Sequence, residues 1–129
     1  MPISVIWDDE EHTILRYLLE GTWQWSEFRP VIAEADGLSR TVDHRVDIIA
    51  DLTTSAPLPV RNAFPTLKYM AELSSDNVLQ GVFVVVGGGG FVRALGKTFA
   101  QVYAGVGARI AFSDTLDEAY ALIQTDREA

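Results

Sequence analysis

The sequence contains no cysteine. This absence excludes a disulfide framework, a thiol nucleophile and a thiolate metal site. Long apolar runs are also missing, since no run approaches the ~18 residues that a membrane span requires. The first residues, MPISVIWDDEE, lack the basic and apolar stretches of a signal peptide. We therefore expect a cytoplasmic protein without a membrane span.

Positive charge and histidine are also scarce. Ten basic residues stand against eighteen acidic ones, and the net charge of −8 disfavours nucleic acid and anionic membranes as partners. An acidic surface can attract a basic protein, although its commoner role is solubility. The two histidines, His12 and His44, have no metal-ligand spacing and no nucleophile beside them. We therefore expect surface histidines, no metal, no cofactor and no enzyme activity.

What the chain does contain is a regular alternation of strand and helix patterns. Its 129 residues suffice for one domain, 1–129, with its own apolar core. The order ββαβαβαβα predicts an α/β fold whose five-stranded sheet is mostly parallel, with an antiparallel hairpin at the N-terminus. Strand patterns lie at 3–7, 13–19, 45–52, 82–86 and 108–112. Helical patterns lie at 28–38, 65–73, 92–106 and 116–123.

The side-chain pattern of the strands predicts which faces of the sheet are covered. If the strands join in sequence order, right-handed crossovers place all the helices on one face. The third strand agrees, because Asp47 and Asp51 share one side, opposite Ile48. The fourth strand is apolar on both sides, so its uncovered side predicts a small apolar patch. That patch is either a contact within a homodimer or shielded by neighbouring side chains.

Consecutive glycines follow the fourth strand and precede a helical pattern: Gly87, Gly88, Gly89 and Gly90. Successive backbone N–H groups before a helix can hold an anion, and Arg93, one turn into the helix, would assist. The plainer interpretation is a turn that needs the conformational freedom of glycine. Both interpretations remain open at this point.

Two nucleotide-binding fingerprints fail near this turn. Gly96-Lys97-Thr98 resembles the end of a P-loop, but the glycine that the motif requires ahead of it would fall at Phe91. The glycines also lack the spacing of a dinucleotide motif. The sequence therefore predicts no nucleotide cofactor.

The segment that follows the third strand carries side chains that can bind a partner. Asp51 stands at the carboxyl end of the strand, where it either forms a turn with backbone N–H groups or contributes to a site. Three hydroxyl residues follow it: Thr53, Thr54 and Ser55. Because open α/β sheets place their sites at the carboxyl ends of their strands, we expect this segment to lie beside the glycine turn on an exposed surface.

The order of the elements, with DIIADLT ending the third strand and ARIAFSDTLDEAYALI closing the chain, resembles the STAS domains. More narrowly, the chain is similar to the SpoIIAA-like (STAS/Sec14-like) bacterial proteins, over nearly its whole length. The resemblance implies a regulatory module without enzyme activity, because the best-known members are anti-sigma-factor antagonists. Those proteins bind a kinase or an anti-sigma partner and are switched by phosphorylation of a serine after the third strand. Thr53, Thr54 and Ser55 lie in that region, but the Asp-Ser-Ser-Gly motif is absent.

Three hypotheses of function follow. The first is a regulatory module that binds a protein partner at the hydroxyl residues and the glycine turn. The second, implied by the relation to Sec14-like proteins, is a binder of a lipid or small apolar ligand. It requires an apolar pocket near Trp23, Trp25, Phe91 or the proline loop after the third strand, although such tryptophans more often only close a core. The third is a small enzyme, for which the sequence offers no nucleophile–base pair.

Overall fold

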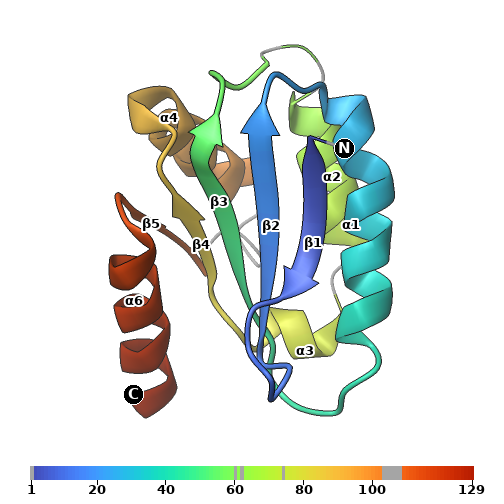
Figure 1. Cartoon of the computed structure of the whole chain (residues 1–129), viewed down its shortest axis with the longest axis vertical. Helices are drawn as coiled ribbons and strands as arrows, with labels where there is room; N and C mark the ends of the chain where they lie inside the picture. Colours follow the sequence, from blue (N-terminus) through green and yellow to red (C-terminus); the bar gives the residue numbers. More distant parts are fainter. Residues whose placement is uncertain (1, 60, 62, 74, 103–108) are drawn as a thin grey trace.

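A computed structural model describes all residues except 1, 60, 62, 74 and 103–108, and it leaves the side chains of Phe91, Ala100 and Val102 outside the description. The order of the elements confirms the predicted α/β fold and adds the short helix α3 (Figure 1). Their bounds are β1 (Ile3–Trp7), β2 (Ile14–Gly21), α1 (Trp25–Ser39), β3 (Asp47–Ser55), α2 (Ala63–Leu73), α3 (Asp76–Leu79), β4 (Phe83–Val86), α4 (Gly89–Val102), β5 (Ile110–Ser113) and α6 (Leu116–Glu128). Tyr103 and Val106, predicted in a helix, lie outside the described residues, as do the glycines at 105 and 107.

The strands form one sheet in the order β1-β2-β3-β4-β5. β1 and β2 pair antiparallel, with Ile3 opposite Leu19 and Trp7 opposite Leu15. The other neighbouring strands are parallel, which confirms the predicted hairpin and parallel sheet. As a result, the carboxyl ends of β3 and β4 meet at the same edge of the sheet.

β3 extends further than the sequence pattern predicted. The hydroxyl residues were expected in a loop, but the strand continues to Ser55, and Thr54 and Ser55 pair with Glu20 and Gly21 of β2. A register shift between Leu18 and Glu20 allows this pairing. Threonine favours extended backbone, and the length of β2 supplies the partner that a local pattern does not reveal.

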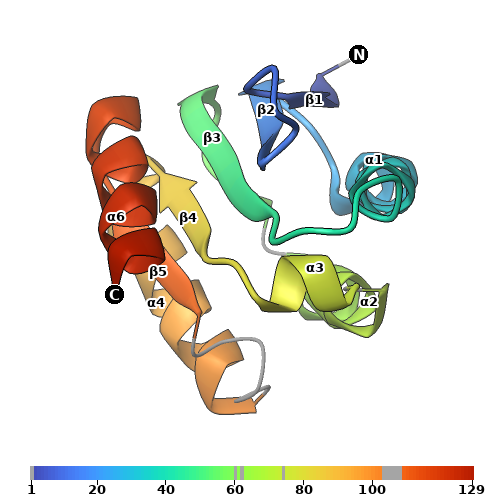
Figure 2. The same cartoon turned by 90° about the horizontal axis from the view of Figure 1, so that it is seen from below.

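One face of the sheet, called here the inner face, packs against α1 and α2 (Figure 2). On β2 this face carries Leu15, Tyr17 and Leu19, each no more than 2% exposed. α4 joins the same core through Val92. Because apolar residues recur at helical spacing, α1 buries one continuous stripe against the sheet: Trp25, Phe28, Val31, Ile32 and Ala35.

The opposite face, called here the outer face, is covered in part by α6 (Figure 2). Ala119 and Ile123 of this helix pack with Ile49, Val84 and Val86 of the sheet. The prediction that all helices lie on one face is therefore wrong. The crossover rule governs a helix that joins two parallel strands, whereas α6 follows the last strand and packs where apolar side chains remain uncovered.

The same helix covers the apolar side of β4. Val84 and Val86 have no exposed surface, so the predicted apolar patch does not reach solvent at these residues. Of the two alternatives, shielding by neighbouring side chains holds here. α6 begins after the N-cap residue Thr115, whose hydroxyl accepts a hydrogen bond from the N–H of Glu118 at 3.2 Å.

Candidate functional site

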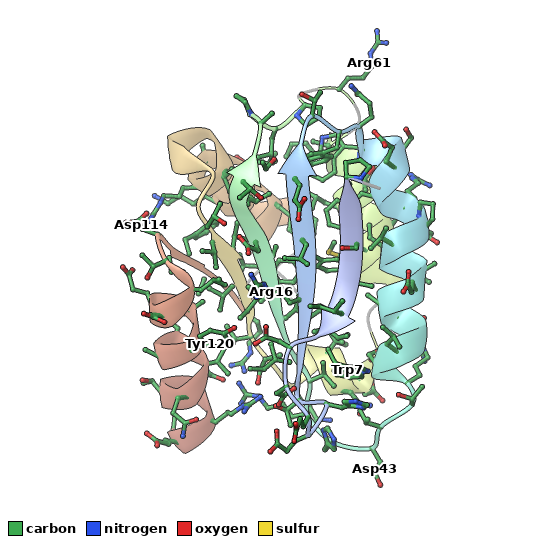
Figure 3. The ribbon with its side chains drawn as sticks, in the orientation of Figure 1. Trp7, Arg16, Asp43, Arg61, Asp114 and Tyr120 are labelled. Carbon is green, nitrogen blue, oxygen red and sulfur yellow. The ribbon has the colours of Figure 1, made fainter. Side chains whose placement is uncertain are left out.

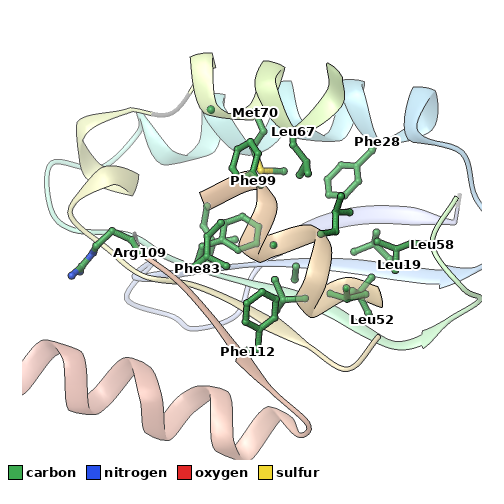
Figure 4. Close-up of a pocket in the computed structure, with 18 of the residues that line it drawn as sticks. Leu19, Phe28, Leu52, Leu58, Leu67, Met70, Phe83, Phe99, Arg109 and Phe112 are labelled. Carbon is green, nitrogen blue, oxygen red and sulfur yellow. The ribbon is translucent and has the colours of Figure 1, made fainter. Parts of the chain in front are cut away.

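An apolar cavity of about 120 Å³ lies between the inner face of the sheet and helices α2 and α4 (Figure 4). The sheet contributes Phe83 and Val85 of β4 and Phe112 of β5. Among the described residues, Arg109 is the one lining residue with a charged side chain. The helices contribute the facing apolar side chains, which include Leu67, Met70, Leu95 and Phe99.

Gly96 allows α4 to approach β5 at this cavity. A Cβ atom on Gly96 would lie 2.2 Å from Cζ of Phe112, so any larger residue would displace the ring. Gly96, Lys97 and Thr98 all lie inside α4, which agrees with the failure of the P-loop pattern. The glycine of that pattern therefore has a packing role, and the ring beside it forms part of the cavity wall.

The two tryptophans predicted near a pocket line the end of the cavity opposite Arg109. Trp23 and Trp25 are 2% and 4% exposed, and their rings meet edge to face at 4.8 Å. The indole N–H of Trp23 donates to the hydroxyl of Ser55 at 2.8 Å. That of Trp25 donates to the carbonyl of Pro59 at 2.7 Å. The polar atoms are thus satisfied elsewhere, and the rings both close the core and present apolar surface to the cavity.

Two partly exposed lining residues lie at the end of the cavity where β4 and β5 begin. Leu79 is 42% exposed there, and the side chain of Arg109 is 39% exposed. The guanidinium of Arg109 donates from Nε to the carbonyl of Gly81 and from Nη2 to that of Gln80, both at 3.0 Å. These bonds hold the side chain at the rim. The sequence pattern gives no signal for Arg109, because its position depends on the pairing of β5 with β4.

A second, polar hollow of about 450 Å³ lies at the carboxyl edge of the sheet. It is lined by Thr53 and Ser55 of β3 and by Gly87 and Gly88 of the glycine turn. A Cβ atom on Gly87 would lie 3.4 Å from the backbone nitrogen of Thr53. Thr53 and Ser55 therefore lie beside Gly87 and Gly88, as the sequence predicted.

The glycine turn uses backbone conformations that suit glycine. Gly87, Gly88 and Gly89 have φ angles of 82°, 85° and 73°, which other residues adopt only at a cost. Arg93 pairs with Asp114 at 3.2 Å, and its guanidinium lies over the ring of Phe112. Asp114 also lines the hollow, and its negative charge opposes the binding of an anion there. The geometry thus favours the turn interpretation of the glycines.

Both carboxylate oxygens of Asp51 have partners. Oδ1 accepts the N–H of Thr53 at 3.0 Å and its hydroxyl at 2.6 Å, and Oδ2 accepts Nη2 of Arg16 at 2.6 Å. Burial acts to raise the pKa of Asp51, but the bonds from Thr53 and Arg16 outweigh it and lower the pKa below 3.8. This geometry matches the turn-forming alternative for Asp51.

Arg16 continues this polar contact towards α6 (Figure 3). Its Nη1 donates to Asp8 at 3.4 Å, and Asp8 also accepts the hydroxyl of Tyr120 at 2.6 Å. Burial, and then the hydrogen bond to Asp8, raises the pKa of Tyr120 to about 12. Tyr120 and Asp8 therefore fasten α6 to the turn between β1 and β2.

The three predicted hydroxyl residues differ in their availability. The hydroxyl of Thr53 is bound to Asp51, and that of Ser55 accepts from Trp23 and donates to the carbonyl of Ala56. Thr54 is exposed, and its hydroxyl makes no hydrogen bond with the described residues. Of the three, Thr54 is the one that another molecule can reach without breaking a bond.

The histidines lie at the surface, as predicted. His12 and His44 are exposed, and His12 stacks on Trp7 with ring centroids 4.6 Å apart. Within the described part of the chain, no group of three or more potential ligands is arranged to hold a metal ion. None of the described helices combines the length and the apolar character needed to cross a membrane.

Comparisons of the chain with models of protein families, with curated proteins and with solved structures find no match. The class of protein is therefore described by its fold and its cavities alone. It is an α/β protein with an apolar cavity on the inner face of a sequentially ordered sheet. A separate polar hollow lies at the carboxyl edge of that sheet.

Proposed function

We propose that the protein binds a small apolar molecule in the cavity between the sheet and helices α2 and α4. The supporting observation is the lining, whose described residues are apolar apart from Arg109 at the rim. Apolar cavities stay dry or take up apolar molecules, because water needs several polar partners. Trp23, Trp25 and Leu58 of the proline loop line the cavity, in the region named for a pocket from the sequence. The side chain of Phe91 lies outside the described residues.

The volume sets the size of this molecule. An apolar cavity of about 150 Å³ in another protein holds benzene, so a volume of about 120 Å³ suits one phenyl ring or a short alkyl chain. Burial of such a group contributes about 0.8 kcal/mol per CH₂, and part of this is offset by the freedom lost on binding. We therefore expect dissociation constants of roughly 0.1–1 mM for simple probes.

Filling the cavity should prevent this binding. Ala71 of α2 lines the cavity, so Ala71→Phe places a ring in the space that the ligand would occupy. We expect phenylpropanol to bind the unmodified protein in an NMR titration, with the largest shift changes at cavity residues. We expect Ala71→Phe to bind phenylpropanol at least about tenfold more weakly.

The matched control makes the same substitution outside the cavity. Ala33 lies on the exposed side of α1, and Ala33→Phe should bind phenylpropanol as the unmodified protein does. Equal binding by the two variants would show that the cavity is not the site. Absence of binding by the folded, unmodified protein would contradict the proposed function itself.

A second function, a regulatory module that binds a protein partner, is favoured by the hollow at the carboxyl edge. The resemblance to STAS domains suggests control by phosphorylation of a hydroxyl beside this hollow. Thr53 and Thr54 are both exposed, but only the hydroxyl of Thr53 is held, by Asp51, so Thr54 is the candidate. A phosphate adds a charge of about −1.5 to −2 to a surface whose protein already carries −8. Such a change is large enough to alter the choice of partner.

Phosphorylation of Thr54 is tested by exposing the protein to a lysate of its source cells with ATP and mapping the modified residues. We expect phosphate on Thr54 and none on Thr53 or Ser55, because their hydroxyls are held in hydrogen bonds. The variant Thr54→Glu should lose a partner that the unmodified protein captures. Thr125→Glu, on the exposed side of α6, should keep it. Capture of the same partners by all three proteins would contradict this function.

A further inference from the structure

The guanidinium group of Arg109, at the rim of the cavity, has hydrogen-bond donors without an acceptor among the described residues. Nε and Nη2 of Arg109 are used by the carbonyls of Gly81 and Gln80 and by Asp126. Nη1 has no acceptor among the described residues. Arginine presents its donors in a rigid planar fork that fits a carboxylate. The unused nitrogen is therefore positioned to receive an anionic group from a molecule that enters the cavity.

The guanidinium group of Arg109 belongs to a network of ion pairs beside the rim. Asp126 accepts Nη2 of Arg109 at 2.8 Å and also Nη2 of Arg45 at 2.6 Å. Arg45 in turn pairs with Asp47, which also pairs with Arg127. Asp9 also acts on Arg127 by its charge, so three guanidinium groups face three carboxylates in this network. Within it, Asp126 is shared by Arg109 and Arg45.

We infer that the ligand of the cavity is an amphipathic monoanion, a short aryl or alkyl carboxylate whose apolar body lies among Phe83, Phe99 and Phe112 and whose carboxylate binds Arg109. This inference rests on the proposed binding of an apolar molecule and adds the chemical class of its head group. A single nitrogen without an acceptor among the described residues suits a carboxylate better than a dianionic phosphate.

The geometry also explains why the carboxylate would remain at the rim. Apart from Arg109, the described lining residues offer no charged group that could replace the water around a carboxylate, and burial of an unpaired charge is costly. The side chain of Arg109 is partly exposed, so a carboxylate bound to it keeps some of its hydration. The ligand therefore enters with its apolar end first.

The test compares two probes of the same shape, phenylpropionate and its neutral counterpart phenylpropanol. We expect the unmodified protein to bind phenylpropionate about tenfold more tightly, as is typical for one charge-assisted hydrogen bond. Arg109→Met keeps an apolar stem at the rim and should remove this preference, so that the variant binds the two probes with equal affinity. Arg93→Met, which changes an arginine outside the cavity lining, should keep the preference.

A second measurement does not depend on the folding of any variant. Added sodium chloride should weaken the binding of phenylpropionate to the unmodified protein and leave the binding of phenylpropanol unaffected, because salt screens partly exposed charges. Equal affinities for the two probes, with no effect of salt, would overturn the carboxylate inference and leave the proposed apolar-ligand function intact. Failure of both probes to bind would overturn both.

Discussion

Replacement of Asp47 by alanine is expected to lower the free energy of unfolding by about 3–5 kcal/mol. Asp47 has no exposed surface, and its carboxylate pairs with Arg45 at 2.8 Å and with Arg127 at 2.7 Å. It also accepts the backbone N–H of Val82 at 2.8 Å. Alanine would leave two guanidinium groups and a backbone donor without this acceptor, and removal of one partner is the most destabilising way to break a buried pair.

Urea denaturation followed by circular dichroism measures this loss. The control variant is Glu72→Ala, which removes an exposed carboxylate 4.0 Å from Lys68 in α2 and should change the stability by less than about 0.5 kcal/mol. An exposed ion pair contributes at most about 1 kcal/mol. If Asp47→Ala lowers the free energy of unfolding by less than this, the ion pairs of Asp47 are not buried and stabilising. The same experiment bears on the rim of the cavity, because Arg45 links Asp47 to Asp126 beside Arg109.

Replacement of Ile123 by alanine is expected to cost about 2–5 kcal/mol. Ile123 is 2% exposed and packs with Ile49 and Val84 on the outer face. Loss of its side chain would leave a space between α6 and the sheet and would remove apolar contacts from both. The expected result therefore tests the placement of α6 on the outer face.

The neighbouring residue provides a control within the same helix. Leu122 is 39% exposed, so Leu122→Ala should change the free energy of unfolding by no more than about 0.5 kcal/mol. Both substitutions lie in α6 and remove side chains of similar volume. The two positions differ in how deeply the side chain is buried. If the two substitutions cost the same, α6 does not pack on the sheet through Ile123, and the outer face must be covered in another way.

The strands and helices could be predicted because each leaves a local pattern in the sequence. Alternation along 3–7 and helical spacing along 28–38 correspond to β1 and α1, and the N-cap at Thr115 begins α6. The sequential order of the strands entered the sequence analysis as a condition, and the structure has that order. These rules act over a few residues or between adjacent elements, and the structure agrees with them.

The placement of α6 could not be predicted in the same way. The rule for crossovers does not apply to a helix after the last strand, and the alternation of Asp47 and Asp51 suggested an uncovered face. In the fold, Asp47 is buried by pairing with Arg45 and Arg127, from distant points of the sequence. The charged residue at position 47 is therefore part of a buried ion pair. The apolar side of β4 is covered by α6.

The sequence by itself determined the class of fold, the antiparallel hairpin and the meeting of Thr53 with the glycine turn. Only the tertiary structure decided which face α6 covers, how the cavity is enclosed and that Arg109 lies at its rim. The physical reason is the range of the interactions. Periodicity and turn chemistry are local, whereas a cavity and its rim arise from side chains that the fold brings together across long separations in sequence.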